Sequence, residues 1–185
     1  PVMDPDRFLG KGTNYAVKDK SIYKEKEIAI FGGGDSALDW SVELAKIAKK
    51  IYLIHRRDEF RGAQHTEKKM RKLVEEGKII LKVPYVIKEI NGDKVFSGVD
   101  LLHFETKEIE TIECDESIFF FGLNKQLGPI HDWGVALENN KILVNTKNFE
   151  TDKPGIFAVG DINDYPGKLD LILCGFHETT LAVQE

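Results

Sequence analysis

The segment Ile28-Ala29-Ile30-Phe31-Gly32-Gly33-Gly34-Asp35-Ser36-Ala37 decides the fold of this chain. Its first four residues predict a short buried strand, and the apolar positions after the glycines predict a helix that runs to about Lys49. A second apolar run, Ile51-Tyr52-Leu53-Ile54, follows directly. A strand, a glycine turn, a helix and a strand in this order form a βαβ unit, whose two strands are parallel and whose crossover is right-handed.

The glycines match the pattern G-x-G-x-x-A, and they lie between a strand and a helix, where this pattern indicates dinucleotide binding. Gly32 permits a tight turn, Gly34 lets the backbone approach a pyrophosphate, and Ala37 lets helix and strand pack closely. The N-terminus of the helix offers free N–H groups to an anion. The predicted cofactor site therefore includes Gly32, Gly33, Gly34, Asp35, Ser36 and Ala37. The alternative is a glycine-rich connection without a ligand.

Three basic or imidazole side chains, His55, Arg56 and Arg57, follow the second strand. An NAD-binding domain has a carboxylate at this place, which hydrogen-bonds the ribose hydroxyls. Guanidinium groups instead hold a 2′-phosphate through bidentate, charge-assisted hydrogen bonds. Arg61 follows after a turn and can return to the same phosphate. The sequence thus predicts a site for NADP(H) rather than NAD(H), formed with His55, Arg56, Arg57 and Arg61; the alternative is a solvated basic loop.

The rest of the chain predicts an α/β domain followed by a looser segment. A second helix is expected over residues 64–76 and a third parallel strand over 79–83. Four short strands are then expected as an antiparallel meander, at residues 86–90, 99–104, 108–112 and 117–121. Beyond residue 123 we expect strands at 142–144 and 156–159 and a final helix from about Asp170. Residues 1–27 are rich in polar and turn-forming residues and predict a lead-in.

Composition argues against several classes of function. The net charge is -5 and the pI is about 5.6, and basic residues do not interleave with aromatic ones, so nucleic-acid binding is disfavoured. No apolar run is long enough to cross a membrane and no secretory signal is visible, so we expect a cytoplasmic protein. Cys114 and Cys174 are too far apart for a CxxC pair or a four-cysteine zinc site, and both are expected to be core thiols. We expect no metal site.

The residues quoted above resemble the NADPH domain of the thioredoxin-reductase-like flavoproteins, including the stretch His55-Arg56-Arg57-Asp58-Glu59-Phe60-Arg61. Downstream, Gly155-Ile156-Phe157-Ala158-Val159-Gly160-Asp161 resembles the second FAD signature of that family, whose aspartate binds the flavin ribityl chain. The resemblance implies that Gly160 and Asp161 bind FAD and that Gly122 approaches the dinucleotide. It also implies an FAD domain that is split around an inserted NADPH domain.

The split places a lead-in at residues 1–12, the NADPH-binding domain at 13–122 and the C-terminal part of the FAD-binding domain at 123–185. The first FAD glycine motif of such proteins lies upstream of the insert. Nothing before Gly32 resembles that motif. We therefore expect the chain to be a fragment of a longer flavoprotein that by itself binds NADP(H) without turnover; the alternative is a natural miniature protein.

Thioredoxin reductases carry a redox CxxC after a segment like Gly10-Lys11-Gly12, but this chain has no cysteine there. The chain is closer to ferredoxin–NADP reductase of the thioredoxin-reductase type, which the segments at residues 18–21 and 165–168 also resemble. His177 departs from that branch, which usually has a small residue at this position.

This branch implies hydride transfer from NADPH to flavin N5 and one-electron release to ferredoxin or flavodoxin by a homodimer. The cofactors supply the chemistry, so no catalytic side chain is expected. Two alternatives stay open: another acceptor, such as a disulfide or a quinone, and a module that binds NADP(H) without turnover. Asp39 is expected either to meet the flavin at a domain interface or to be an ordinary surface acid.

Overall fold

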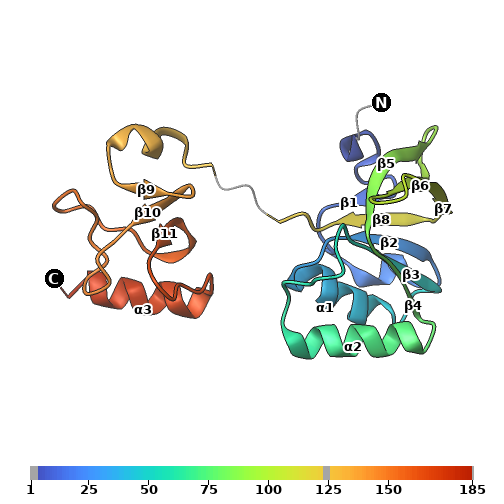
Figure 1. Cartoon of the computed structure of the whole chain (residues 1–185), viewed down its shortest axis with the longest axis horizontal. Helices are drawn as coiled ribbons and strands as arrows, with labels where there is room; N and C mark the ends of the chain where they lie inside the picture. Colours follow the sequence, from blue (N-terminus) through green and yellow to red (C-terminus); the bar gives the residue numbers. More distant parts are fainter. Residues whose placement is uncertain (1–3, 123–125, 185) are drawn as a thin grey trace. The chain divides into compact units, whose positions relative to one another are not determined.

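A computed structural model describes residues 4–122 and 126–184 of this chain. These residues form two compact units, one within Pro1–Gly122 and one within Leu123–Glu185 (Figure 1). The predicted boundary at residue 123 falls at positions 123–125, outside the described residues. Within the described ranges, no helix has the length and apolar character that crossing a membrane requires.

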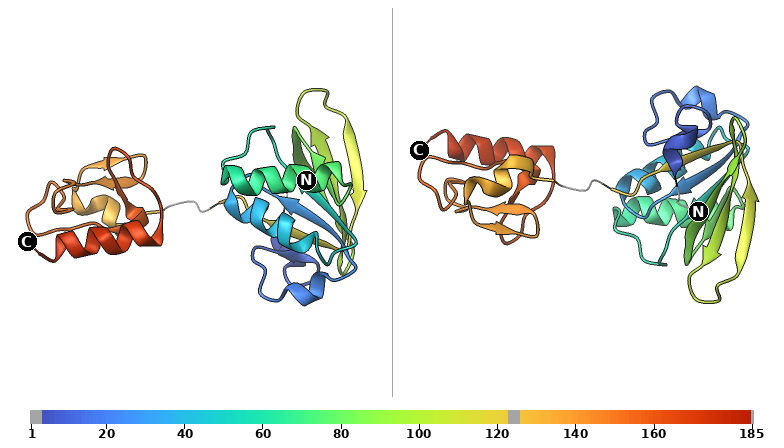
Figure 2. Two further views of the ribbon diagram at one scale, coloured as in Figure 1. Left: turned by 90° about the horizontal axis from the view of Figure 1, so that it is seen from below. Right: turned by 90° about the horizontal axis from the view of Figure 1, so that it is seen from above.

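A parallel sheet of five strands lies at the centre of the first unit, in the order β1-β8-β2-β3-β4. The strands are β1 (Thr13–Asn14), β2 (Glu27–Phe31), β3 (Lys50–Ile54), β4 (Ile79–Lys82) and β8 (Glu116–Phe119). Helix α1 (Asp35–Leu44) connects β2 to β3, and α2 (Gln64–Glu75) connects β3 to β4. Both helices cover the same face of the sheet (Figures 1 and 2). The predicted Rossmann-like arrangement is confirmed, although α1 ends five residues earlier than expected.

Side-chain alternation along β2 explains why both faces of this sheet are covered. Ile28 and Ile30 pack beneath the helices, whereas Ala29 and Phe31 belong to the core on the opposite face. All four are at most 2% exposed. Four consecutive buried apolar residues in a strand require a packed layer on each side, as in other parallel sheets.

A second, antiparallel sheet forms the layer opposite the helices. It consists of β5 (Tyr85–Gly92), β6 (Phe96–His103) and β7 (Ile109–Glu113), paired in that order. The predicted meander is correct for these three strands and wrong for the fourth, because β8 pairs in parallel with β1 and β2. All four residues of β8 are buried, whereas β7 alternates between exposed and buried positions. A strand that is buried on both faces belongs in the middle of the parallel sheet.

The N-terminal residues contribute to the core of the first unit. A 3₁₀ helix, η1 (Pro5–Phe8), buries Phe8 among residues of both sheets, and η2 (Lys20–Tyr23) buries Tyr23 beneath the helices. Both rings are 1% exposed. Strand β1 follows η1 and precedes η2 in the sequence. It pairs with β8, with Thr13 opposite Ser117. The segment that its polar composition predicted as a lead-in therefore supplies two buried aromatic rings and an edge strand.

The second unit is smaller and has less regular structure. It contains η3 (Gly128–Trp133), β9 (Leu137–Glu138), β10 (Lys141–Leu143), η4 (Gly160–Ile162), β11 (Asn163–Asp164) and α3 (Ile172–Ala182). Strand β10 lies between β9 and β11. The strand expected over residues 156–159 is wrong, because the structure has there an isolated bridge between Glu150 and Phe157. The buried apolar residues described for this unit are Val135, Ile142, Phe149 and Ala158, and Val135, Ile142 and Ala158 form one cluster with partly buried neighbours.

Replacing Phe8 with alanine tests whether the N-terminal segment is part of the fold. Because the ring is buried at the junction of both sheets, we expect the free energy of unfolding to fall by about 3–5 kcal/mol. Urea denaturation followed by circular dichroism measures the change. Leu9→Ala is the matched control, since Leu9 is 53% exposed. Equal stability of the two variants would show that the segment does not stabilise the domain.

Candidate nucleotide-binding site

The turn between β2 and α1 carries the predicted glycine motif and is sterically tight at its first glycine. Gly32 has φ +142°, and a Cβ atom on it would lie 2.4 Å from the carbonyl oxygen of Phe120 and 3.1 Å from Cβ of Ala37. No atom lies within 4 Å of the Cβ position of Gly34. Gly34 is the N-cap of α1, and no side chain caps the helix. No side chain therefore takes up the first N–H groups of α1, which can donate to an anion.

The loop after β3 folds over this turn. The backbone N–H of Arg61 donates to the carbonyl of Gly33 at 2.7 Å, and that of Ala63 donates to the Asp35 carboxylate at 2.7 Å. Asp35 therefore anchors the loop to the start of α1. Ser36 is exposed in the first turn of α1, and Ala37 is buried against the strand. The structure thus brings the two predicted motifs together, through a bond between residues that lie 28 positions apart in the sequence.

His55 packs against the glycine turn. A Cβ atom on Gly33 would lie 2.3 Å from Nε2 of His55, so the imidazole occupies the space that a side chain would need. The backbone N–H of His55 donates to the carbonyl of Lys82, and the carbonyl of His55 accepts from the N–H of Tyr85. Burial, followed by the charge of Arg56, lowers the pKa of His55 below its ordinary value. The neutral ring thus supports the turn, a role that the sequence pattern did not distinguish from phosphate binding.

Three arginines of the loop are available to an anion. Arg56, Arg57 and Arg61 are exposed, and among the described residues no carboxylate pairs with any of them. The one carboxylate of the loop that forms an ion pair, Asp58, binds Arg71 at 3.1 Å. Arg71 also forms an ion pair with Glu67 and lies over the ring of Phe60, so its charge is already paired inside the first unit. Among the described residues, the guanidinium groups of Arg56, Arg57 and Arg61 therefore have no carboxylate partner beside the glycine turn.

Two further residues singled out in the sequence, Gly122 and Asp39, lie after β8 and within α1. Gly122 follows β8, whose continuation passes Gly32 at Phe120, and it has φ +85° with no atom within 4 Å of its Cβ position. Asp39 lies one turn into α1 and accepts a hydrogen bond from the Thr66 hydroxyl at 3.1 Å. This contact links α1 to α2 and gives Asp39 a structural partner in the first unit.

In the second unit, Gly160 and Asp161 begin η4, and Gly160 has φ +78°. The Asp161 side chain is exposed. A hollow of about 240 Å³ lies beside this turn and the start of α3. It is lined by Val159, Gly160, Ile172, Gly175, Phe176 and Thr179. The final helix begins at Ile172, later than predicted, and no side chain caps it.

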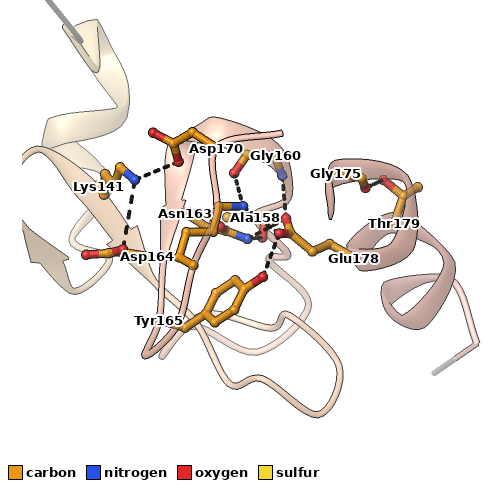
Figure 3. Close-up of polar contacts among 11 residues, drawn as sticks. Lys141, Ala158, Gly160, Asn163, Asp164, Tyr165, Asp170, Gly175, Glu178 and Thr179 are labelled. Atoms are coloured by element: carbon orange, nitrogen blue, oxygen red, sulfur yellow. Dashed lines mark hydrogen bonds and ion pairs between the residues drawn. The ribbon is translucent and has the colours of Figure 1, made fainter. Parts of the chain in front are cut away.

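A buried polar cluster beneath this turn was not predicted from the sequence. Figure 3 shows the Glu178 carboxylate at its centre, bonded to Gly160, Asn163 and Tyr165. Burial alone would raise the pKa of Glu178, but the bonds from Lys168 and these groups hold it below its ordinary value. Burial and the bond to Glu178 raise the pKa of Tyr165 to about 12. One signal in the sequence was available: Glu178 is the only acidic residue in the segment Ile172–Ala182.

The outer face of α3 is apolar. Four large side chains near its start are between 52% and 82% exposed, namely Leu171, Ile172, Leu173 and Phe176. An exposed patch of this kind marks a surface that another polypeptide or a ligand covers.

The pH dependence of stability should report the burial of His55. Because the pKa of His55 is lowered in the folded state, the unfolded chain takes up more protons as the pH falls through about 6.5. Stability should therefore be highest above this pH and decrease between pH 7 and 5. His55→Gln should flatten this decrease in urea titrations, whereas His65→Gln, on the exposed surface of α2, should not. Identical slopes for wild type and His55→Gln would show that the ring is solvated.

Known proteins resemble this chain over nearly its whole length. A ferredoxin--NADP reductase of Bradyrhizobium sp. (strain BTAi1 / ATCC BAA-1182) is 47% identical over 185 residues, which are 100% of this chain and 54% of the relative. Another, of Nitrobacter winogradskyi, is 50% identical over the same shares. The crystal structure of Lactococcus lactis thioredoxin reductase has a TM-score of 0.84 at 26% identity, over 99% of this chain and 59% of that chain. The chain spans about half the length of the curated relatives it matches.

A single family model covers the glycine turn, the loop that carries Arg56, Arg57 and Arg61 (the arginine loop), and the turn at Gly160 and Asp161. This model is described as pyridine nucleotide-disulphide oxidoreductase, and it matches residues 6–184. The chain is therefore a member of the pyridine nucleotide-disulphide oxidoreductase family.

Proposed function

We propose that this chain belongs to an NADPH-dependent flavoprotein reductase that passes electrons from NADPH through FAD to ferredoxin or flavodoxin. Residues 13–122 form the NADPH-binding domain in this proposal, and residues 123–185 form the C-terminal part of the FAD-binding domain. One observation carries it: an uncapped helix N-terminus at a glycine turn lies beside three arginines that lack a carboxylate partner among the described residues. The names of the relatives support the assignment.

The residues of the first unit fit NADP(H). The open space at Gly34 admits a pyrophosphate to the N–H groups of α1, which gain hydrogen bonds and a favourable dipole interaction. Arg56, Arg57 and Arg61 supply guanidinium donors for a 2′-phosphate. Gly122 leaves room beside the β8 end of the sheet. The neutral His55 ring packs on Gly33, so the turn keeps its shape whether or not the phosphate is bound.

The residues of the second unit fit part of an FAD site. Gly160 adopts a conformation that favours glycine, and Asp161 presents an exposed carboxylate that can accept hydrogen bonds from ribityl hydroxyls. Oδ1 of Asn163 is buried and has no hydrogen-bond partner among the described residues, so a donor from a bound group or from further polypeptide would satisfy it. The apolar face of α3 offers further polypeptide a surface to pack against.

In this proposal the protein binds and orients NADPH and FAD, and these cofactors carry out the electron transfer. When bound, FAD accepts a hydride from NADPH and releases electrons singly to the acceptor protein. The arginine loop selects the phosphorylated nucleotide, and the glycine turn fixes its pyrophosphate. The disulfide route of thioredoxin reductases is disfavoured, because Cys114 is buried with its pKa raised to about 12 by burial and Asp115, and Cys174 lies in the other unit. A cytoplasmic location and a homodimer stay predictions.

Nucleotide titration tests the first half of the proposal. Calorimetry of this chain should show binding of NADP⁺ in clear preference to NAD⁺. Arg56→Ala should weaken NADP⁺ binding about tenfold to a hundredfold, the effect of losing a hydrogen bond to a charged group, and should leave NAD⁺ binding unchanged. Lys68→Ala is the matched control, because Lys68 is an exposed cation of the same basic stretch on α2. Equal affinity for both nucleotides would contradict the 2′-phosphate site.

Acceptor reduction tests the second half. The full-length protein that contains this chain should purify with FAD, and NADPH should reduce ferredoxin or flavodoxin through it in stopped-flow absorbance measurements. Arg56→Ala should slow the reaction at low NADPH concentration and approach the wild-type rate at saturation. Rapid reduction of a disulfide or a quinone, with no reduction of ferredoxin or flavodoxin, would contradict the proposed acceptor. A colourless protein that still binds NADP⁺ would indicate a module without turnover.

A further inference from the structure

The second unit contains a buried ion pair, between Lys168 and Glu178. Their side chains are 3% and 0% exposed. Removing two charges from water is costly, and such a pair persists only where further hydrogen bonds satisfy both groups. The pair is buried in a unit whose described apolar cluster has three buried members, Val135, Ile142 and Ala158.

Both oxygens of the Glu178 carboxylate are satisfied. Oε2 accepts from the backbone N–H of Gly160 at 2.7 Å and from Nδ2 of Asn163 at 3.0 Å. Oε1 accepts from the Tyr165 hydroxyl at 2.9 Å and from Nζ of Lys168. The donors come from the segment before α3, which therefore wraps around a single side chain of that helix (Figure 3).

The pair holds the backbone of Gly160 from both sides. Its N–H donates to Glu178, and its carbonyl oxygen accepts from Nζ of Lys168 at 2.9 Å. Asn163 extends the same arrangement, because its Nδ2 also donates to the carbonyl of Ala158 at 2.8 Å. The peptide groups on either side of Gly160 are thereby fixed, and Asp161 follows directly.

We propose that Lys168 and Glu178 are positioning residues, which hold the turn at Gly160 and Asp161 in the conformation that binds FAD. This inference rests on the proposed function, since it assigns the turn to FAD. The buried pair acts through the backbone, while Asp161 supplies the exposed carboxylate that meets the cofactor. The two side chains bond the N–H and the carbonyl of the same residue, directly before Asp161.

The double variant Lys168→Met/Glu178→Gln separates positioning from stability. It leaves no unpaired buried charge, and the amide oxygen introduced at position 178 still accepts from the N–H of Gly160, so the protein should unfold within a few degrees of the wild type. The carbonyl of Gly160 loses its donor, so the FAD dissociation constant should rise about tenfold or more. Affinity for NADP⁺, which binds the other unit, should not change. Lys153→Met is the matched control, because it removes an exposed lysine that pairs with Asp152 in the same unit.

The measurements are made on the full-length protein, by titrating the apoprotein with FAD and by amide hydrogen exchange of the peptide that contains Gly160. Weaker FAD binding and faster exchange at that peptide, at unchanged thermal stability, would support the inference. Unchanged FAD affinity in the double variant, or a loss of affinity that only follows a loss of stability, would overturn the inference alone. A wild-type protein that binds no FAD would overturn the proposed function and this inference with it.

Discussion

The close approach of α1 to β2 is the constraint on which the first unit depends. At Gly32 a side chain would collide with the carbonyl of Phe120 and press on Ala37, so only glycine lets strand, helix and the extension of β8 meet at one point. Next to this point β8 pairs with β2 in the sheet. The same steric condition thus holds the strand end, the extension of β8 and the start of α1 close together, where the nucleotide is proposed to bind.

The arginine loop depends on that turn in its own way. Its backbone binds Gly33 and the Asp35 carboxylate, and the His55 ring fills the space beside Gly33. The Asp58 carboxylate of the loop forms an ion pair with Arg71. The neighbouring arginines therefore have no carboxylate partner among the described residues. A guanidinium group without a carboxylate partner is stable only where water or an anion surrounds it. The exposure of these arginines and their proposed binding of a 2′-phosphate both follow from this requirement.

The second unit combines an apolar cluster with a buried polar cluster around Glu178. Glu178 and Lys168 satisfy the backbone of a turn that has little regular structure, while large apolar side chains of α3 remain exposed. A unit of this kind gains stability when its apolar face is covered. The polar contacts at the turn and the exposed face of α3 both agree with the proposal that this unit is part of an FAD-binding domain.

Local patterns in the sequence determined the βαβ unit, the glycine turn and the arginine loop, because strand and helix periodicity and glycine geometry act over a few residues. Only the tertiary structure decided the rest. The parallel pairing of β8 with β1 and β2, the burial of Phe8, and the packing of His55 on Gly33 join residues that are far apart in the chain. The Lys168–Glu178 pair spans only 10 positions, yet its burial depends on how α3 packs. Periodicity cannot reveal such contacts, since they follow from the path of the whole backbone.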